Sequence, residues 1–177
     1  MMIRMAVEAD VPAMLAIYSP YVLNTTASFE YEPPTEAEFL ARFRGITDRL
    51  PWLVWEEEGE ILGYAYGSLP FERAAYAWCA EASVYLKSEA RGRGIGKKLY
   101  EALEKFLRAQ GYCKIYAIIT SENAASLAFH RKMGYKFTGE FPNCGYKFGR
   151  WMGVIWMEKV LENSGHMTKF PVSWRKI

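Results

Sequence analysis

The chain reads EASVYLKSEARGRGIGKKLYEALEKF from Glu81 to Phe106, and this stretch decides the fold. Residues 81–86 alternate apolar, aromatic and β-branched side chains with polar ones, which is typical of a strand. From Ile95 onward, apolar side chains recur with helical spacing at Leu99 and Leu103, which predicts one face of an amphipathic helix. The stretch therefore predicts a strand, a glycine-rich turn and a helix, in that order.

The turn is rich in both glycine and positive charge. Alternate glycines let the backbone turn tightly, and several N–H groups at the start of the helix then point at one anion. Two arginines and two lysines accompany these glycines, so a pyrophosphate is the simplest ligand. The residues of this anion-binding loop are Arg91, Gly92, Arg93, Gly94, Ile95, Gly96 and Lys97.

Three other interpretations of a glycine-rich turn must be weighed. A P-loop requires Ser or Thr after its Gly-Lys pair, but Lys98 follows Lys97 here. A dinucleotide-binding turn has Gly-x-Gly-x-x-Gly directly after its strand, whereas residues 87–91 intervene here and the glycines strictly alternate. A plain structural turn would not need so many cations.

The pattern Arg-Gly-x-Gly-x-Gly between a strand and a helix resembles the GNAT superfamily of acyl-CoA-dependent N-acetyltransferases. The resemblance implies a single-domain α/β fold with a mixed, mostly antiparallel central sheet flanked by helices. It implies that residues 91–97 bind the pyrophosphate of acetyl-CoA, which is the co-substrate. It adds Val84, Leu86, Asn123 and Ser126 to the residues expected to contact acetyl-CoA, with an N–H near Val84 as the oxyanion site.

Length and composition narrow the class of protein. A chain of 177 residues, 51% of them hydrophobic, can bury a core of its own. No apolar run approaches the ~20 residues that span a membrane, and the N-terminus lacks a signal-peptide pattern. A net charge of +2 is too balanced for nucleic acid. Three scattered cysteines and two histidines do not suggest a metal site. We therefore expect a cytoplasmic enzyme without a metal.

The rest of the chain predicts alternating strands and helices, which indicates a mixed α/β sheet. Residues 162–177 show no periodicity, so the domain is expected to comprise residues 1–161, with a tail packed on it or on a dimer partner. The last strand is apolar on both faces, which predicts burial on both sides or a homodimer interface. The predicted strands are 3–7, 52–57, 60–68, 81–86, 113–120, 135–140 and 146–160, and the predicted helices begin near residues 11, 35, 95 and 124.

Glu81 is the candidate general base. Strand alternation places Glu81, Ser83 and Tyr85 on one face. A carboxylate beside Trp78 and Cys79 in an otherwise apolar strand should have its pKa raised by desolvation. A base for an ammonium substrate needs such a pKa, because the amine must lose a proton before it attacks a thioester. The alternative is a buried glutamate that pairs with a lysine or arginine for structure.

His130 is the candidate general acid. Asn123 is the predicted N-cap of the helix that carries His130. In many GNAT members a tyrosine stands at the position of His130 and protonates the departing thiolate. The resemblance therefore makes His130 a second catalytic candidate, and a satisfied histidine on the helix surface explains it equally well.

A closer resemblance joins the chain to the phosphinothricin and methionine sulfoximine N-acetyltransferase subfamily. The matching segments are RAAYAW (73–78), EASVY (81–85), SEN (121–123) and GYKFGRW (145–151). The resemblance implies a small amino acid as substrate, acetylated on its α-amino group by direct transfer in a ternary complex. The residues implied to surround that substrate are Phe29, Arg73, Tyr76, Ser83 and Tyr85.

One residue departs from the subfamily pattern. Members associated with phosphinothricin carry a histidine, assigned a catalytic role, where this chain has Phe148. The departure favours methionine sulfoximine or methionine sulfone as substrate over phosphinothricin. It leaves Glu81, directly or through water, as the evident base.

Two other functions remain open from the sequence. A protein or peptide N-acetyltransferase would need an open groove, whereas Phe29, Tyr76, Tyr85 and Trp151 predict a closed aromatic pocket. A non-catalytic acyl-CoA sensor would need no base, and the presence of Glu81 argues against it.

Overall fold

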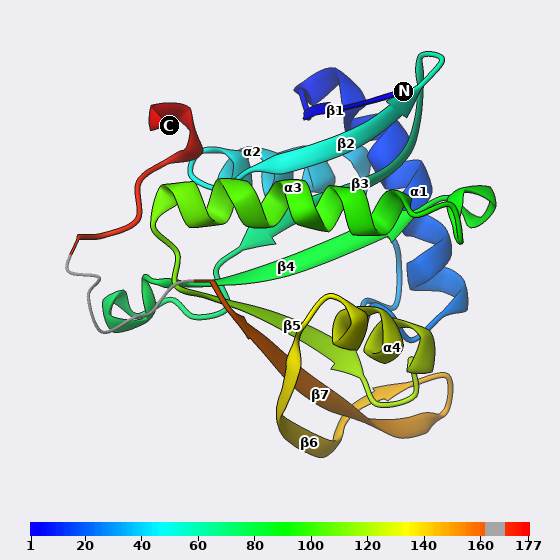
Figure 1. The fold of residues 1–177 in the computed structure, drawn as a ribbon. Coiled ribbons are helices and arrows are strands. Elements are labelled where there is room, and N and C mark those ends of the chain that lie inside the picture. The colour runs from blue at the N-terminus through cyan, green and yellow to red at the C-terminus, as the bar shows by residue number, and fades with distance from the viewer. Residues whose placement is uncertain (162–168) are drawn as a thin grey trace.

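The computed structural model describes residues 1–161 and 169–177, shown as a ribbon in Figure 1. The strands are β1 (Met2–Met5), β2 (Trp52–Glu57), β3 (Glu60–Ser68), β4 (Cys79–Leu86), β5 (Lys114–Thr120), β6 (Lys136–Lys147) and β7 (Arg150–Val160). The helices are α1 (Val11–Asn24), α2 (Glu36–Thr47), α3 (Ile95–Gln110) and α4 (Ala124–Lys132). No helix among these residues is long and apolar enough to cross a membrane.

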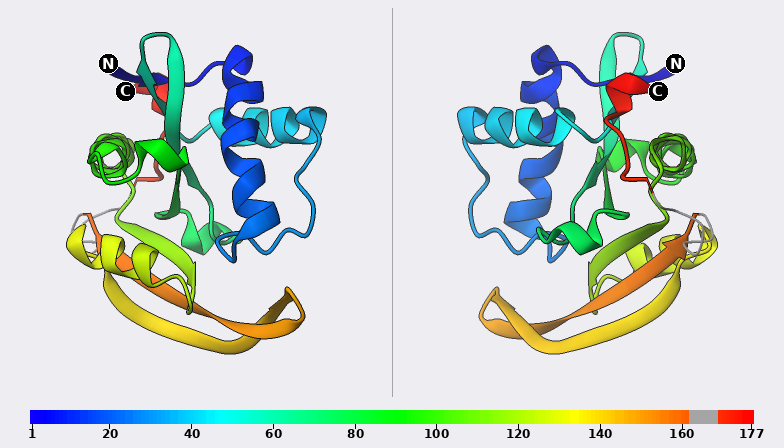
Figure 2. Two further views of the ribbon diagram at one scale, coloured as in Figure 1. Left: turned by 90° about the vertical axis from the view of Figure 1, so that its right-hand side faces the viewer. Right: turned by 90° about the vertical axis from the view of Figure 1, so that its left-hand side faces the viewer.

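The strands form one sheet in the order β1-β2-β3-β4-β5-β7-β6. Among the described strands, β4 and β5 pair in parallel, and the other neighbours pair antiparallel. Helices α1 and α2 cover one face of the sheet, and α3 and α4 cover the other (Figure 2). The predicted mixed, mostly antiparallel α/β fold is therefore confirmed.

Local signals placed several elements correctly. The hairpin of β2 and β3 and the helix α4 have the predicted bounds. At the start of α2, Thr35 Oγ accepts from the Glu38 N–H at 3.3 Å while the Glu38 carboxylate accepts from the Thr35 N–H at 2.7 Å. This is the reciprocal pair of a capping box. Gly111 ends α3 with a φ of +97°, which favours glycine.

The closing strands differ from the prediction. β6 continues to Lys147, because irregularities between Phe137 and Gly139 and between Phe141 and Gly145 absorb residues that break the sequence pattern. β7 lies inside the sheet between β5 and β6, so it offers no free edge to a second copy. Its apolar side chains find partners within the chain, as with the buried Met157, and its pattern alone does not indicate a dimer.

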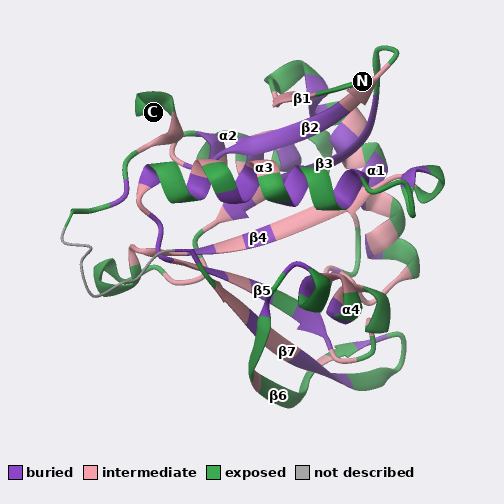
Figure 3. Ribbon diagram, viewed as in Figure 1, coloured by how far each residue is buried: buried purple, intermediate pink, exposed green. Residues whose placement is uncertain are grey.

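The core lies on both sides of the sheet. Leu99, Leu103 and Leu107 of α3 are fully buried against the first face, and α1 and α2 pack over Trp52 and Tyr64 on the second. Strands β2 and β3 are largely buried, whereas β6 is mostly exposed (Figure 3). The two cores hold β4 rigidly in the centre of the molecule.

β4 and β5 part after a short contact, and this parting positions the site. Their pairing covers Cys79–Glu81 of β4 and ends at the pair Glu81↔Tyr116. Beyond it the two strands diverge (Figure 1). The second half of β4 therefore has β3 on one side and no strand on the other.

The described part of the tail lies on the domain itself. The Val172 N–H donates to the Gln110 carbonyl at 2.9 Å, and the Trp174 indole donates to the Thr47 carbonyl at 2.9 Å. Phe170 stacks on Trp78 with ring centroids 4.8 Å apart. These contacts join residues 169–177 to the ends of α2 and α3.

Candidate active site

A cavity of about 620 Å³ fills the space between the parted strands. β4 and β5 form its two walls, and the end of α1, the start of α3 and one face of α4 complete it. The predicted site residues that line it are Ser83, Val84, Tyr85, Leu86, Arg91, Gly96, Asn123, Ser126 and His130. No group of three or more potential metal ligands gathers anywhere in residues 1–161 and 169–177.

Among the described residues, the backbone N–H and C=O of Val84 in β4 face this cavity without a neighbouring strand. The Tyr21 hydroxyl donates to the Leu86 carbonyl at 2.7 Å and accepts from the Leu86 N–H at 3.1 Å. The Tyr100 hydroxyl lies 2.9 Å from the Ala82 carbonyl. Strand alternation directs the N–H and C=O of Val84, between these two residues, to the same side. Because β5 has moved away there, the polar groups of Val84 face the cavity without a strand partner.

The anion-binding loop has the backbone that its glycines predict. Gly92 and Gly94 adopt φ values of +75° and +78°, and the N-cap of α3 is Gly94. No other atom would crowd a Cβ at either position, so the glycines are required by conformation and not by space. Arg91 lines the cavity with its guanidinium 5.0 Å from the centre of the Tyr21 ring.

Three side chains of the loop point away from the cavity. Arg93 forms an ion pair with Glu57 at 2.7 Å, and Lys97 lies 3.8 Å from Glu101 on the exposed face of α3. Ile95 is buried in the core. For an anion in the cavity these residues therefore offer backbone N–H groups, while Arg91 offers the side-chain charge.

Asn123 and Ser126 stand where α4 meets the cavity. The Asn123 side chain accepts from the Ser126 N–H at 3.1 Å, which confirms the predicted N-cap. The Ser126 hydroxyl lies 3.3 Å from His130 Nδ1. The cap thus fixes the start of the helix that carries His130.

His130 is buried and not on the helix surface. Its exposed fraction is 4%, so the surface interpretation is wrong. Its Nδ1 lies 2.8 Å from the Ser126 carbonyl and its Nε2 lies 2.9 Å from the Tyr100 hydroxyl. Desolvation lowers the pKa of His130, although the hydrogen bond with Ser126 opposes this. The imidazole is therefore neutral at pH 7, with Nδ1 as donor and Nε2 as acceptor from Tyr100.

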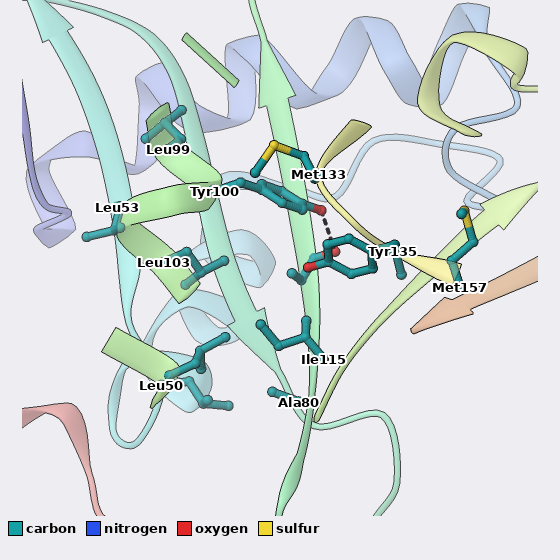
Figure 4. Close-up of a cluster of buried hydrophobic side chains, with 14 of the residues drawn as sticks. Leu50, Leu53, Ala80, Leu99, Tyr100, Leu103, Ile115, Met133, Tyr135 and Met157 are labelled. Atoms are coloured by element: carbon teal, nitrogen blue, oxygen red, sulfur yellow. Dashed lines mark hydrogen bonds between the residues drawn. The ribbon is translucent and has the colours of Figure 1, made fainter. Parts of the chain in front are cut away.

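Tyr100 connects His130 to β4 from the opposite side of the cavity. It lies in the core beside Tyr135 and Met133 (Figure 4). Its single hydroxyl proton is within hydrogen-bonding distance of both the Ala82 carbonyl and His130 Nε2. This buried hydroxyl has one proton and two acceptors, so it donates to one of them at a time.

Glu81 has the electrostatics that a general base requires. Desolvation raises the pKa of Glu81 from 4.5 to about 7. No lysine or arginine among the described residues forms an ion pair with it, which argues against the alternative of a structural salt bridge. Glu81 occupies the last pair before β4 and β5 part, opposite Tyr116, and the following residues Ala82 and Ser83 line the cavity. Glu81 itself lies just outside the cavity wall.

The residues predicted to surround a substrate fall into separate groups. Tyr85 is packed against Tyr18, Tyr21 and Tyr64 in the core, with its face toward the cavity only in part. Arg73 and Tyr76 lie in the exposed loop before β4, and Ser83 lies in the strand itself.

The four rings that the sequence predicts around a closed pocket do not stack on one another in the described part of the chain. The Tyr76 ring contacts Phe71 at 4.5 Å, and Trp151, 63% exposed, contacts Tyr146 at 5.4 Å. Phe29 lies against Gly145. The four rings belong to segments far apart in the sequence, and each packs against a different residue.

A family model described as an acetyltransferase (GNAT) domain matches residues 3–156. The chain belongs to the GNAT family. Acetyl-CoA is therefore the co-substrate of this enzyme, and the cavity fits it in two respects. The N–H and C=O of Val84 can hydrogen-bond an extended amide chain. Arg91 and Gly96 line the cavity beside the Gly92–Gly94 turn, where they can hold a pyrophosphate.

Curated GNAT relatives align along almost the whole chain. The L-methionine sulfoximine/L-methionine sulfone acetyltransferase of Pseudomonas paraeruginosa is 42% identical over 167 residues, which cover 90% of this chain and 94% of the relative. The phosphinothricin N-acetyltransferase of Alcaligenes faecalis is 38% identical over 168 residues, which cover 94% and 85%.

A solved GNAT structure shares the fold. It is a phosphinothricin acetyltransferase from Sinorhizobium meliloti in complex with AcCoA, with a TM-score of 0.89 and 39% identity. The alignment covers 96% of this chain and 92% of that one. The predicted membership and fold are thus confirmed by sequence and by structure.

Sequence reasoning missed Tyr21, Tyr100 and Lys147. Tyr21 and Tyr100 sit on apolar faces of their helices, where a tyrosine signals core packing and not a hydrogen bond to a distant strand. The available signal for Lys147 was its place inside the GYKFGRW segment, which the GNAT fold in general does not demand.

Proposed function

We propose that this GNAT enzyme acetylates the α-amino group of a small amino acid of the methionine sulfoximine or methionine sulfone type. The observation that carries the proposal is Glu81, a carboxylate with a pKa of about 7 and no cation paired with it, at the point where β4 and β5 part. The substrates named for the Pseudomonas paraeruginosa and Alcaligenes faecalis relatives support the substrate class.

Glu81 removes a proton from the substrate ammonium, and the free amine then attacks the thioester directly. Because Glu81 lies just outside the cavity wall, a water molecule completes the path. The Val84 N–H donates to the oxyanion that forms. The described residues that line the cavity include no cysteine, which supports direct transfer in a ternary complex over a covalent acyl-enzyme.

The pair Tyr100 and His130 supplies the proton for the departing thiolate. Tyr100 holds a proton within reach of His130 Nε2, and both residues line the cavity. His130 Nε2 orients the Tyr100 hydroxyl, which gives its proton to the thiolate sulfur, and water then restores the proton of Tyr100. This assigns the role of the family tyrosine to two residues of the present chain.

Phe148 sets the preference between substrates. It lines the cavity and presents a ring without charge or polar atoms. A sulfoximine or sulfone side chain is neutral and can lie beside this ring, whereas the phosphinate of phosphinothricin is anionic and loses hydration there. Arg73, in the loop before β4, binds the substrate carboxylate.

The test is thiol release from acetyl-CoA across a panel of free amino acids. We expect turnover with methionine sulfone and methionine sulfoximine, and a kcat/KM for phosphinothricin lower by about tenfold or more. Phe148→His should narrow that difference. The matched control is Phe170→His, at an exposed position of the C-terminal tail outside the cavity lining.

The same panel includes short peptides. Turnover of peptides with no turnover of free amino acids would reject the small-amino-acid proposal and favour a peptide N-acetyltransferase. Acetyl-CoA binding without turnover of any amine would favour an acyl-CoA sensor.

We also propose a homodimer, built on the exposed aromatic side chains of the β6–β7 hairpin. Phe137, Phe141 and Trp151 are each more than half exposed on this hairpin, and burying exposed aromatic side chains against a second copy would remove them from water. Light scattering at micromolar concentration should give twice the mass of the chain, and Trp151→Asp should shift it toward the monomer. A monomeric mass for the unmodified chain would contradict the proposal.

A further inference from the structure

Lys147 is a charged residue in an unusual position. It ends β6, and its exposed fraction is 1%. Within residues 1–161 and 169–177 its ammonium forms no ion pair with a carboxylate. It donates instead to three backbone carbonyls, those of Val22 at 2.6 Å, Thr25 at 3.0 Å and Ser28 at 2.7 Å.

The three acceptors match the three donors of a lysine ammonium. An ammonium has three N–H groups and no acceptor, so each N–H has one carbonyl. Val22 and Thr25 belong to the last turn of α1 and its end, where backbone carbonyls lack helical partners and the helix dipole favours a cation. The charge therefore closes the end of α1 and fixes the loop that follows it.

Two further contacts join the same two segments. The Phe29 ring lies so close to Gly145 that an added Cβ would meet its Cε2 at 2.2 Å. The Tyr31 hydroxyl donates to the Tyr146 carbonyl at 2.6 Å. The segments 22–31 and 145–147 are thus joined at three points, and we name this set of contacts the clasp.

The clasp borders the cavity on both sides. Asn24, Thr25, Thr26 and Ala27 line the cavity from the α1 side. On the other side, the turn after Lys147 carries Phe148 with a φ of +53°, and Phe148 also lines the cavity. Figure 2 shows the β6–β7 hairpin curling toward the face of the sheet that carries α1. Lys147 itself is absent from the lining, and its three N–H groups are all engaged.

We propose that Lys147 is a positioning residue for amine binding, which holds residues 22–28 and Phe148 in the geometry that admits the amino-acid substrate. This inference rests on the proposed function and adds the residue that orders its substrate side. It also explains the GYKFGRW segment: Gly145 makes room for Phe29, Tyr146 offers its carbonyl to Tyr31, and Lys147 supplies the charge.

Lys147→Met tests the proposal, because methionine keeps the length and apolar stem and removes the ammonium. We expect the KM for methionine sulfone to rise by about tenfold, because a shift of about 1 Å in positioning groups has effects of this size or larger. The dissociation constant for acetyl-CoA, measured by titration calorimetry, should stay within about twofold, since the anion-binding loop lies outside the clasp. Lys136→Met, at the exposed start of the same strand, is the matched control and should leave both constants unchanged.

A second variant addresses the case in which Lys147→Met fails to fold. Gly145→Ala displaces the Phe29 ring without leaving a buried charge or carbonyl unpaired. We expect the same split, a higher KM for the amine and an unchanged affinity for acetyl-CoA. Hydrogen exchange over residues 22–31 should accelerate in both variants, whether or not any amine is acetylated.

The outcomes separate the inference from the proposed function. Faster exchange in residues 22–31 without turnover of any amino acid by the unmodified chain would uphold the clasp and reject the substrate. Lower thermal stability with an unchanged KM for methionine sulfone would overturn the positioning role. An equal loss of affinity for amine and acetyl-CoA would overturn it too.

Discussion

Glu81→Gln is expected to lower kcat/KM for the amine at pH 7 by about 10²–10³-fold, the usual contribution of a positioned general base. Glutamine keeps the size of the side chain and its hydrogen-bonding capacity, but it cannot accept the proton. The affinity for acetyl-CoA should remain nearly unchanged, because Glu81 does not line the cavity. Steady-state kinetics and titration calorimetry measure the two quantities separately.

The pH profile gives a sharper test of the same residue. With a pKa of about 7, Glu81 is largely protonated at pH 6 and largely ionised at pH 8. The rate of the unmodified enzyme should therefore rise with pH through about 7, and this inflection should vanish in Glu81→Gln. Glu36→Gln, an exposed glutamate in the first turn of α2, is the control and should keep the inflection.

The rate should rise with pH, but the contribution of Glu81 to the stability of the fold should fall. Because the folded pKa of Glu81 is raised from 4.5 to about 7, the folded state holds a proton that the unfolded state has lost within that window. The contribution of Glu81 to stability therefore falls as pH rises from 4.5 to 7. The melting temperature of Glu81→Gln should exceed that of the unmodified chain by an amount that grows as pH increases from 5 to 8.

A fully active Glu81→Gln variant would contradict the assignment of Glu81 as the general base.

Gly94→Val is expected to weaken acetyl-CoA binding by about 10- to 100-fold, or ~1.4–2.8 kcal/mol. Gly94 has a φ of +78°, and a β-branched residue is strained in this conformation by at least about 1–2 kcal/mol. The loop can relieve that strain by moving, since nothing lies within 4 Å of the added Cβ. Folding therefore survives, and the binding of the pyrophosphate must restore the strained geometry.

Gly139→Val is the matched control for this experiment. Gly139 lies on β6, where an added Cβ would also meet nothing within 4 Å and the φ is not positive. We expect its acetyl-CoA affinity to equal that of the unmodified chain. An unchanged affinity in Gly94→Val, measured by calorimetry, would show that the anion-binding loop does not hold the co-substrate in its present backbone conformation.

The parts of the site that sequence alone could predict depend on local rules. Gly94 and the Asn123 cap need only their immediate neighbours, and both have the predicted conformations. The raised pKa of Glu81 was also predictable, because the apolar character of its own strand produces the desolvation.

The remaining parts of the site depend on contacts between residues that are far apart in the sequence. Tyr21 bonds to Leu86, 65 residues away, and Lys147 bonds to Val22, 125 residues away. In the sequence, Lys147 looks like a surface lysine near a turn. Its neighbours in the chain do not show that three backbone carbonyls surround its ammonium. Likewise, β4 and β5 each have an ordinary strand pattern, and nothing in either pattern marks the pair Glu81↔Tyr116 as the place where their pairing ends.

Because β4 and β5 part, the second half of β4 has no hydrogen-bonded strand on its β5 side in the described part of the chain. β1–β4 and β5–β7 form two blocks, joined in the ladder at Cys79–Glu81 and separated beyond it. A ligand that hydrogen-bonds to Val84 takes the place of a neighbouring strand that is absent there among the described residues. Any molecule that binds the folded state raises its free energy of unfolding. The resistance of this enzyme to heat and proteolysis should therefore increase with the concentration of acetyl-CoA. The enzyme should be least stable in a cell whose acetyl-CoA is depleted.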